Sequence, residues 1–188
     1  MNEPTTSSTF AIRHRRTGEV LFECEPLKGQ SLTITAQDCH LIEQAIAAKV
    51  DLSEAELCGR SLNGANLSGQ NLSGADLTWV NLSQANLSGT VLPAGVPVIP
   101  DIDKAILAAI EAGGSLVMEV WHRCDTAHCR AGWAVHLAGR AGYNLEKELG
   151  SGTAGALIYA ASRPGMPVPD FHTSDRLAMA DLIACAGA

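Results

Sequence analysis

Long apolar runs are absent from this chain of 188 residues, and none approaches the roughly 20 residues that a membrane-spanning helix needs. An excess of basic side chains is absent too. The formal net charge is −7, which argues against a nucleic-acid binder that works by neutralising phosphates. The first ten residues lack a basic stretch followed by an apolar core, so we expect no secretory signal. Together these absences predict a cytoplasmic protein with neither a membrane nor a nucleic acid as its partner.

Familiar catalytic and redox motifs are also missing. The sequence has no P-loop, no G-x-G-x-x-G after a predicted strand and no G-x-S-x-G, which removes the commonest phosphate, dinucleotide and serine-hydrolase sites. The six cysteines form no C-x-x-C pair, and a chain of this length needs no disulfide framework, so we expect reduced thiols. The sequence therefore favours a protein without enzymatic activity, while leaving that question open.

The chain does contain a regular series of leucines, five residues apart. Nine successive leucines keep this spacing without a gap: Leu52, Leu57, Leu62, Leu67, Leu72, Leu77, Leu82, Leu87 and Leu92. In an α-helix a step of five residues rotates the side chain by about 140°, so the leucines would spiral around the axis. In a strand an odd step turns each leucine to the opposite face. The leucines share one direction only if the chain turns a corner every five residues, closing a four-sided coil after twenty.

The neighbours of the leucines support these corners. A permissive glycine stands two places after five of the leucines, at Gly59, Gly64, Gly69, Gly74 and Gly89. A small alanine stands two places before four of them, at Ala55, Ala65, Ala75 and Ala85. The stretch GANLSGQNLSGADLTWVNLSQANLSG resembles the pentapeptide-repeat family, whose unit is A-[ND]-L-x-x. Over residues 50–92 the resemblance implies a right-handed quadrilateral β-helix of little more than two coils.

Three residues of this segment depart from the family pattern. Arg60 and Gln70 occupy the slot of the small inward residue. An unpaired buried arginine is costly, so we expect Arg60 either to turn outward or to meet an acidic partner from the N-terminal segment. Trp79 replaces a corner glycine and should project outward. Its indole either packs against a flanking segment or anchors a binding partner.

Two coils are too few to stand alone, so the flanking segments must cover both ends. Residues 1–49 read as a disordered start over 1–8, a β-hairpin with a glycine turn at 16–19, and a helix over 36–49 that plugs the first coil. A short strand over 31–35 is a further expectation.

A proline-rich connector over residues 93–100 leads into a helical C-terminal domain over 101–188. Residues 115–121 form a strand or an extended link. Asp101 and either Asp125 or Thr126 should cap their helices, and Asp170, Asp175 and Asp181 should cap or solvate the last one. Helices are expected over about residues 101–112, 126–141, 145–149, 153–162 and 174–184. The predicted fold is therefore mixed, with the short β-helix capped by a hairpin plus helix and by helices.

The densest chemistry lies in the stretch VWHRCDTAHCRAGWAVHLAG, which contains His122, Cys124, His128 and Cys129. This stretch resembles the C-terminal region of short bacterial and prophage pentapeptide-repeat proteins, with the pattern W-H-x-C-x-T-x-H-C-x-A-G-W. The resemblance supplies no biochemical function. A structural interpretation is that Thr126 caps a helix whose Gly132 permits a close crossing and whose cysteines are simply buried.

Two chemical interpretations compete with the structural one. His122, Cys124, His128 and Cys129 have the right chemistry for zinc, although adjacent His128 and Cys129 would point about 100° apart on a helix. Alternatively, Cys124 just before a helix N-terminus would have a lowered thiol pKa and could act as a nucleophile, with His122 or His128 as its base. We expect no cofactor, with zinc as the one exception that these residues could suit.

The leading functional prediction is a non-enzymatic module that binds a protein partner through a rigid solenoid face, with Trp79 as the candidate contact. The Cys/His-site protein is the alternative, and homo-oligomerisation stays open. A DNA-mimicking topoisomerase inhibitor is a remote alternative, because residues 51–92 carry only four acidic side chains and one basic one. A duplex mimic needs a longer and more strongly charged rod.

Overall fold

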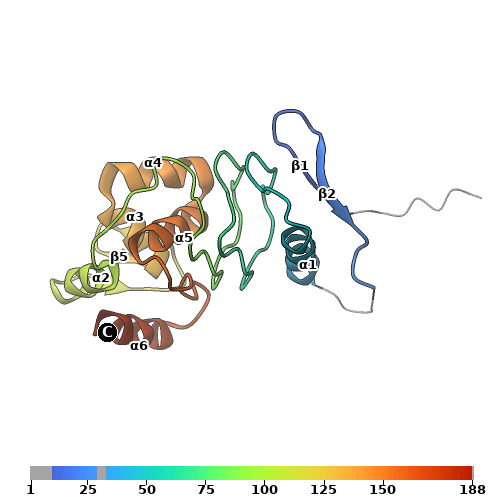
Figure 1. Ribbon diagram of the computed structural model, residues 1–188. Helices are drawn as coiled ribbons and strands as arrows, with labels where there is room; N and C mark the ends of the chain where they lie inside the picture. The colour runs from blue at the N-terminus through green and yellow to red at the C-terminus, as the bar shows by residue number, and fades with distance from the viewer. Residues whose placement is uncertain (1–9, 29–32, 188) are drawn as a thin grey trace, which may run out of the picture.

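The computed structural model describes residues 10–28 and 33–187, and only the backbone of Arg123 and Cys124. Three parts follow one another along the molecule: a hairpin with one helix, the leucine repeats, and a helical part at the opposite end (Figure 1). The disorder predicted for residues 1–8 falls outside the described residues.

The N-terminal part is an antiparallel hairpin followed by one helix. Strand β1 (Phe10–Arg13) pairs with β2 (Val20–Cys24), and helix α1 spans Ile34–Ala47. Thr33 caps α1, because its hydroxyl accepts the N–H of Ala36 at 3.1 Å. The hairpin and the helix match the prediction. The strand expected over residues 31–35 is wrong at its end, since α1 begins at Ile34, and residues 31–32 are outside the described part.

The leucine column is buried as the spacing predicts. Leu92, at the end of the series, is only partly buried, whereas the other eight are at most 5% exposed: Leu52, Leu57, Leu62, Leu67, Leu72, Leu77, Leu82 and Leu87. The carbonyl of each of these eight leucines accepts the N–H three residues later, as from Ala65 to Leu62 at 3.1 Å. Between each leucine and the residue that donates this N–H lies a residue with positive φ, such as Gly64 at 71°. A corner at every fifth residue is therefore present.

Neighbouring passes of the chain are paired with a register of twenty residues. The N–H of Leu62 donates to the carbonyl of Asn81 at 2.9 Å, and the N–H of Asn81 donates back to Arg60 at 3.0 Å. Throughout residues 50–92, all of which are described, this pairing consists of isolated bridges rather than continuous strands. The parallel bridges join Glu56 with Asp76, Ser61 with Asn81, Asn66 with Asn86, and Asn71 with Val91.

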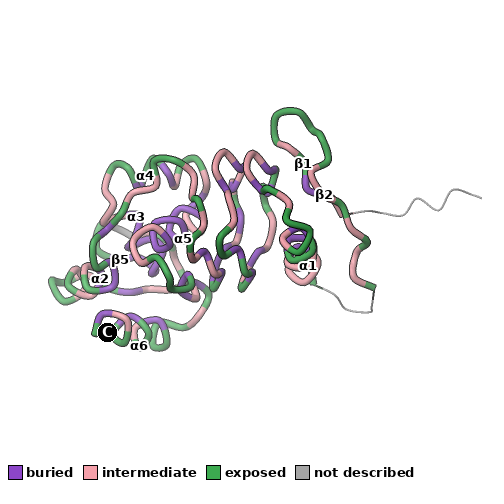
Figure 2. Tube along the Cα trace, in the orientation of Figure 1, coloured by how far each residue is buried: buried purple, intermediate pink, exposed green. Residues whose placement is uncertain are grey.

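Both ends of the repeat segment are covered. Helix α1 closes the first end, where the hydroxyls of Thr35 and Ser61 lie 2.7 Å apart. At the other end the chain after helix α5 (Ser151–Ser162) donates a backbone hydrogen bond from Val168 to Ala85 at 2.9 Å. Buried residues are found in α1, in the repeats and in α5 (Figure 2). One hydrophobic core therefore joins the three parts.

The helical part surrounds α5. Its helices are α2 (Ile102–Glu111), α3 (Arg130–Leu137), α4 (Gly139–Leu149), α5 (Ser151–Ser162) and α6 (Asp175–Ala186). Helix α5 is buried almost all round and packs against α3 and α4. Gly155 allows the close approach of α3, because a Cβ there would lie 2.5 Å from the Cβ of Ala131. None of the helices in the described residues has the length and apolarity to cross a bilayer.

The helix predicted over residues 126–141 is wrong at its start and in its continuity. Residues 122–128 instead form β4 (His122–Cys124) and β5 (Ala127–His128), and β5 pairs with β3 (Ser115–Leu116) and with β4. Helix α3 therefore begins at Arg130, with Cys129 as its N-cap instead of Asp125 or Thr126. Ala138 separates α3 from α4, whose first residue, Gly139, has φ 59°. Helix α4 includes the short helix expected over 145–149.

The expected acidic cap of α2 is present in position only. Asp101 precedes the helix, but its side chain makes no capping hydrogen bond, because its backbone is left-handed at φ 48°. An N-cap residue normally has an extended backbone, which directs its side chain toward the free N–H groups of the first helical turn. Asp101 therefore marks the start of α2 without stabilising it in the predicted way.

Candidate functional site

Two tryptophans flank a cavity of about 410 Å³ where the repeats meet α5. Trp79 comes from a repeat corner and Trp121 from the residue before β4. Between them lie Ser151 and Gly152, the first residues of α5, and His172 contributes to the wall. Among the described residues, no lysine, arginine, aspartate or glutamate lines this cavity. The cavity suits an apolar or aromatic group with a few polar contacts.

Each indole is seated on a glycine. A Cβ on Gly150 would lie 2.7 Å from the ring of Trp79, and one on Gly152 would lie 3.2 Å from the ring of Trp121. The backbone N–H of Trp79 also donates to the carbonyl of Leu149 at 2.8 Å. Trp79 therefore packs against the helical part, as one of its two sequence interpretations expects, while 71% of the residue stays exposed.

Two tryptophans and one tyrosine of the described chain are exposed. Trp79, Trp121 and Tyr143 are 71%, 39% and 41% exposed. The ring of Tyr143 lies 5.8 Å from that of His122, the residue that follows Trp121. Exposed tryptophan and tyrosine are enriched where proteins bind one another. We call Trp79, Trp121 and the cavity between them the tryptophan site.

Behind the tryptophan site, the predicted cysteine–histidine cluster is partly assembled. The Nδ1 atoms of His122 and His128 lie 2.7 Å apart. The Nε2 atom of His122 lies 2.9 Å from the Oε1 atom of Glu146, which also accepts the hydroxyl proton of Ser151. A hydrogen-bonded series therefore runs from buried His128 to Ser151 at the cavity wall.

His128 is held tightly and is only 1% exposed. Its ring stacks on His136 at 4.7 Å and meets Trp133 edge-on at 4.6 Å. Its Nε2 atom is buried and has no hydrogen-bond partner among the described residues. Burial lowers the pKa of His128, a backbone hydrogen bond with Asp125 opposes that shift, and the nearby His122 and His136 lower it further. The imidazole is therefore neutral near pH 7.

Cys129 is the N-cap of α3, and its thiol is buried. Its Sγ accepts the N–H of Gly132 at 3.3 Å as the cap of α3, and the residue is 1% exposed. Burial raises the pKa of this thiol to about 11, so it stays protonated at neutral pH. The expected 100° divergence of His128 and Cys129 on one helix is also wrong, because His128 belongs to β5.

Cys124 does not stand at a helix N-terminus. Its backbone belongs to β4, and α3 begins only at Arg130, so the proposed lowering of its thiol pKa by a helix dipole is wrong. Its side chain lies outside the described part. Among the described side chains, no three of His, Cys, Asp or Glu are arranged to hold a metal ion. Gly132 likewise accommodates the carbonyl of Trp121 rather than a crossing helix.

A buried ion-pair network in the helical part was not foreseen. Arg130 is 1% exposed, and its Nη2 atom lies 2.7 Å from Oδ1 of Asp103, while its Nη1 atom pairs with Asp181. The Oδ2 atom of Asp103 binds Arg163 at 3.0 Å. The Nε atom of Arg130 donates to the hydroxyl of Tyr159 at 3.0 Å. Asp181, predicted to cap or solvate the last helix, instead neutralises a buried arginine.

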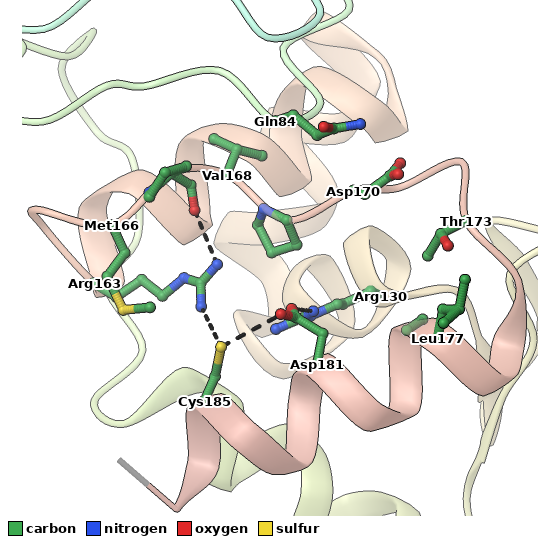
Figure 3. Close-up of a pocket in the computed structure, with 13 residues that line it drawn as sticks. Gln84, Arg130, Arg163, Met166, Val168, Asp170, Thr173, Leu177, Asp181 and Cys185 are labelled. Carbon is green, nitrogen blue, oxygen red and sulfur yellow. Dashed lines mark hydrogen bonds and ion pairs between the residues drawn. The ribbon is translucent and has the colours of Figure 1, made fainter.

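The network borders a second cavity, of about 370 Å³, between α6 and the segment over residues 166–170 (Figure 3). Arg130, Arg163, Asp181 and Cys185 meet there, and Cys185 Sγ lies 3.3 Å from Nη1 of Arg163. With Asp103, the two arginines and two carboxylates cancel in charge. The arrangement therefore holds α2, α3 and α6 together, and Asp170 adds a further carboxylate to the wall of the cavity. The only sign of this network in the sequence is the presence of charged residues on otherwise apolar helices. Charged residues at solvent-exposed positions give the same pattern.

Comparison with known proteins supports the repeat segment. Residues 51–89 match the family model of pentapeptide repeats, in eight copies. No curated protein and no solved structure matches the chain. The match covers the residues in which a buried leucine, a corner and a twenty-residue register recur. Residues 51–89 of this chain are therefore similar to pentapeptide repeats.

Proposed function

We propose that this chain is a non-enzymatic protein-interaction module, of the bacterial or prophage origin that its resemblance implies. Residues 50–92 would form a short right-handed quadrilateral β-helix, capped by residues 1–49 and, through the connector 93–100, by residues 101–188. The parallel bridges with a register of twenty support this architecture. A cytoplasmic location, where the thiols stay reduced, belongs to the same proposal.

The observation that carries the proposal is the placement of Trp79. Five repeat corners use glycine at positive φ, whereas Trp79 adopts φ 57° with a bulky side chain. Left-handed backbone costs a residue with a Cβ roughly 1 kcal/mol, and such strain tends to persist at functional positions. The corner nevertheless presents an indole that is 71% exposed. A protein partner that covers the indole of Trp79 would explain why an exposed apolar ring is kept at a strained corner.

The tryptophan site indicates the kind of partner. Hot spots of protein interfaces combine tryptophan or tyrosine with a pocket from which water is excluded. The cavity beside Trp79 and Trp121 has no Lys, Arg, Asp or Glu in its described wall, and it suits an apolar or aromatic side chain of another protein. The net charge of −7 disfavours a nucleic acid in this position.

The experiment replaces Trp79 with glycine, the residue that the other corners prefer. Trp79→Gly keeps the backbone conformation and removes the indole. Partners captured from an extract of the source cells with the wild-type chain are identified, and the affinity of the purified partner is then titrated. We expect Trp79→Gly to weaken binding by at least about tenfold, the size of a typical hot-spot loss.

Gln84→Gly is the matched control. Gln84 also occupies a left-handed corner, at φ 60°, but lies outside the tryptophan site. We expect this variant to bind as the wild type does. Cys124→Ser should change binding only as far as it changes thermal stability. Equal partner binding by the wild type and by folded Trp79→Gly would refute the proposal.

A further inference from the structure

Both rings of the tryptophan site are held in place by backbone contacts. The backbone N–H of Trp79 donates to the last carbonyl of α4 at 2.8 Å, and its ring lies against Gly150. The carbonyl of Trp121 lies against Gly132, where a Cβ would be only 2.0 Å away, and its ring lies against Gly152. Rings that are fixed before binding lose little conformational freedom when a ligand arrives. The site therefore offers a ligand two aromatic walls whose positions are already set.

Side-chain N–H groups of the tryptophan site lack acceptors in the described structure. The indole N–H groups of Trp79 and Trp121 have no acceptor among the described residues, whereas that of buried Trp133 donates to a backbone carbonyl at 3.1 Å. The amide nitrogen of Asn81 has none either, because only the Oδ1 atom of this side chain is used, by the N–H of Ser83. The wall therefore offers donors to a ligand.

The two hydroxyl groups of the wall already donate within the protein. Ser151 donates to Glu146, and Thr153 donates to the carbonyl of Val80 at 2.8 Å. No Lys, Arg, Asp or Glu belongs to the described wall. The complementary ligand is therefore neutral and apolar, and it carries hydrogen-bond acceptors without donors.

A proline-rich segment has this combination. Proline has no backbone N–H, and the polyproline II conformation leaves its carbonyls free to accept. A helical ligand would use its carbonyls within itself, and an extended strand of other residues would bring N–H groups that need acceptors from the wall. Grooves lined by aromatic side chains bind polyproline II segments in several kinds of recognition domain.

We propose that the tryptophan site binds a proline-rich segment of the partner protein in the polyproline II conformation. Its proline rings pack against Trp79 and Trp121, and its carbonyls accept the two indole N–H groups. A polyproline II segment is stiff before it binds, so little entropy is lost on either side. This inference rests on the interaction module proposed above and specifies the chemistry of its ligand.

The probe is a neutral peptide of about ten prolines, blocked at both ends, which adopts polyproline II by itself. The chain has three tryptophans, so NMR of the full-length protein resolves one indole N–H signal for each. We expect the peptide to shift the signals of Trp79 and Trp121 and to leave that of Trp133, which is 3% exposed, unchanged. A glycine–serine peptide of the same length should bind at least about tenfold more weakly.

Asn81→Asp tests the amide donor. Aspartate keeps the oxygen that accepts the N–H two residues later, as Asp76 does toward Thr78 at 3.0 Å. The variant loses the N–H donor and should bind the proline peptide about 3–10-fold more weakly. Asn66→Asp is the matched control, because Asn66 makes the same turn contact with Ser68 at 3.2 Å but lies outside the tryptophan site. It should bind as the wild type does.

The inference is overturned if the proline peptide binds no more tightly than the glycine–serine peptide, or if it shifts the indole signal of Trp133 instead. Equal weakening by Asn66→Asp and Asn81→Asp would overturn it as well. Failure here is distinguishable from failure of the interaction proposal. A partner protein that requires Trp79, together with a proline peptide that leaves the indole signals unchanged, refutes the proline-rich ligand alone.

Discussion

Arg60 of the repeats and Asp38 of α1 form an ion pair whose Nη1 and Oδ1 atoms lie 3.0 Å apart. The same carboxylate accepts the N–H of Ser61 at 2.8 Å, and Nη2 of Arg60 donates to the carbonyl of Ala11 at 2.7 Å. The arginine in a small-residue slot thus meets an acidic partner from the N-terminal segment, one of the two outcomes expected from sequence. The pair fastens α1 and the hairpin to the first coil.

Asp38→Ala should therefore destabilise the chain strongly. The substitution leaves a mostly buried guanidinium and the N–H of Ser61 without their acceptor, at a cost of about 3 kcal/mol in unfolding free energy. Urea unfolding measures the loss. Exposed Glu43→Ala on the same helix should cost far less. Adding Arg60→Ala, which restores a small residue, should recover part of the loss, and no recovery would contradict the pairing.

Leu62→Ala and Leu92→Ala test the leucine column. Leu62 is fully buried, so its truncation leaves a cavity and should cost about 3–5 kcal/mol. Leu92 is only partly buried at the end of the series and should cost about 1–2 kcal/mol. Urea unfolding of the two variants provides the comparison. Similar losses of unfolding free energy at both positions would contradict a buried leucine column that ends before Leu92.

Asp76→Asn tests a charge within the repeats. A hydrogen bond from the Thr78 side chain lowers the pKa of Asp76 below 3.8, burial opposes the shift, and the Thr78 backbone and Arg15 add to it. Ionised Asp76 therefore stabilises the fold above pH 3.8, and this contribution is lost as pH falls through the lowered pKa. Asparagine keeps a side-chain oxygen that can accept the backbone N–H of Thr78. Asn81 shows the same arrangement, because its Oδ1 atom accepts the backbone N–H of Ser83 at 3.0 Å.

The variant should melt at a lower temperature than the wild type at pH 7, and the difference should shrink toward zero as the pH falls below the lowered pKa. Calorimetric melting curves at neutral and acidic pH measure both values. A difference that grows in acid would contradict the sign of the pKa shift.

Asp103→Asn and Asp181→Asn rank the two carboxylates around Arg130. The Asp103 side chain is 8% exposed and serves two arginines, so removing its charge should cost about 3 kcal/mol. The Asp181 side chain is 55% exposed, and water can replace much of its interaction, so the cost should stay below about 1 kcal/mol. Denaturant midpoints measure the ranking, and a reversed order would contradict the burial of Asp103.

The cysteine–histidine stretch shows the limit of sequence reasoning. Its residue types suggested a helix from Thr126 and a thiol at that helix's N-terminus. The backbone of this segment pairs instead with β3, as in the hydrogen bond from Ser115 to Thr126 at 2.8 Å. That pairing moves the helix start to Arg130 and places His122 opposite His128. Local patterns of apolar and polar residues carry no information about such a partner.

The sequence by itself determined the corners, the register of twenty and the buried leucines. Each repeat imposes the same local conformation, and its neighbours in space lie at a fixed separation along the chain. The tertiary structure alone decided that Trp79 rests on Gly150, that Asp181 neutralises Arg130 and that Glu146 supports His122. These contacts join segments whose separation follows no period, so they depend on how α-helices pack once the repeats have formed.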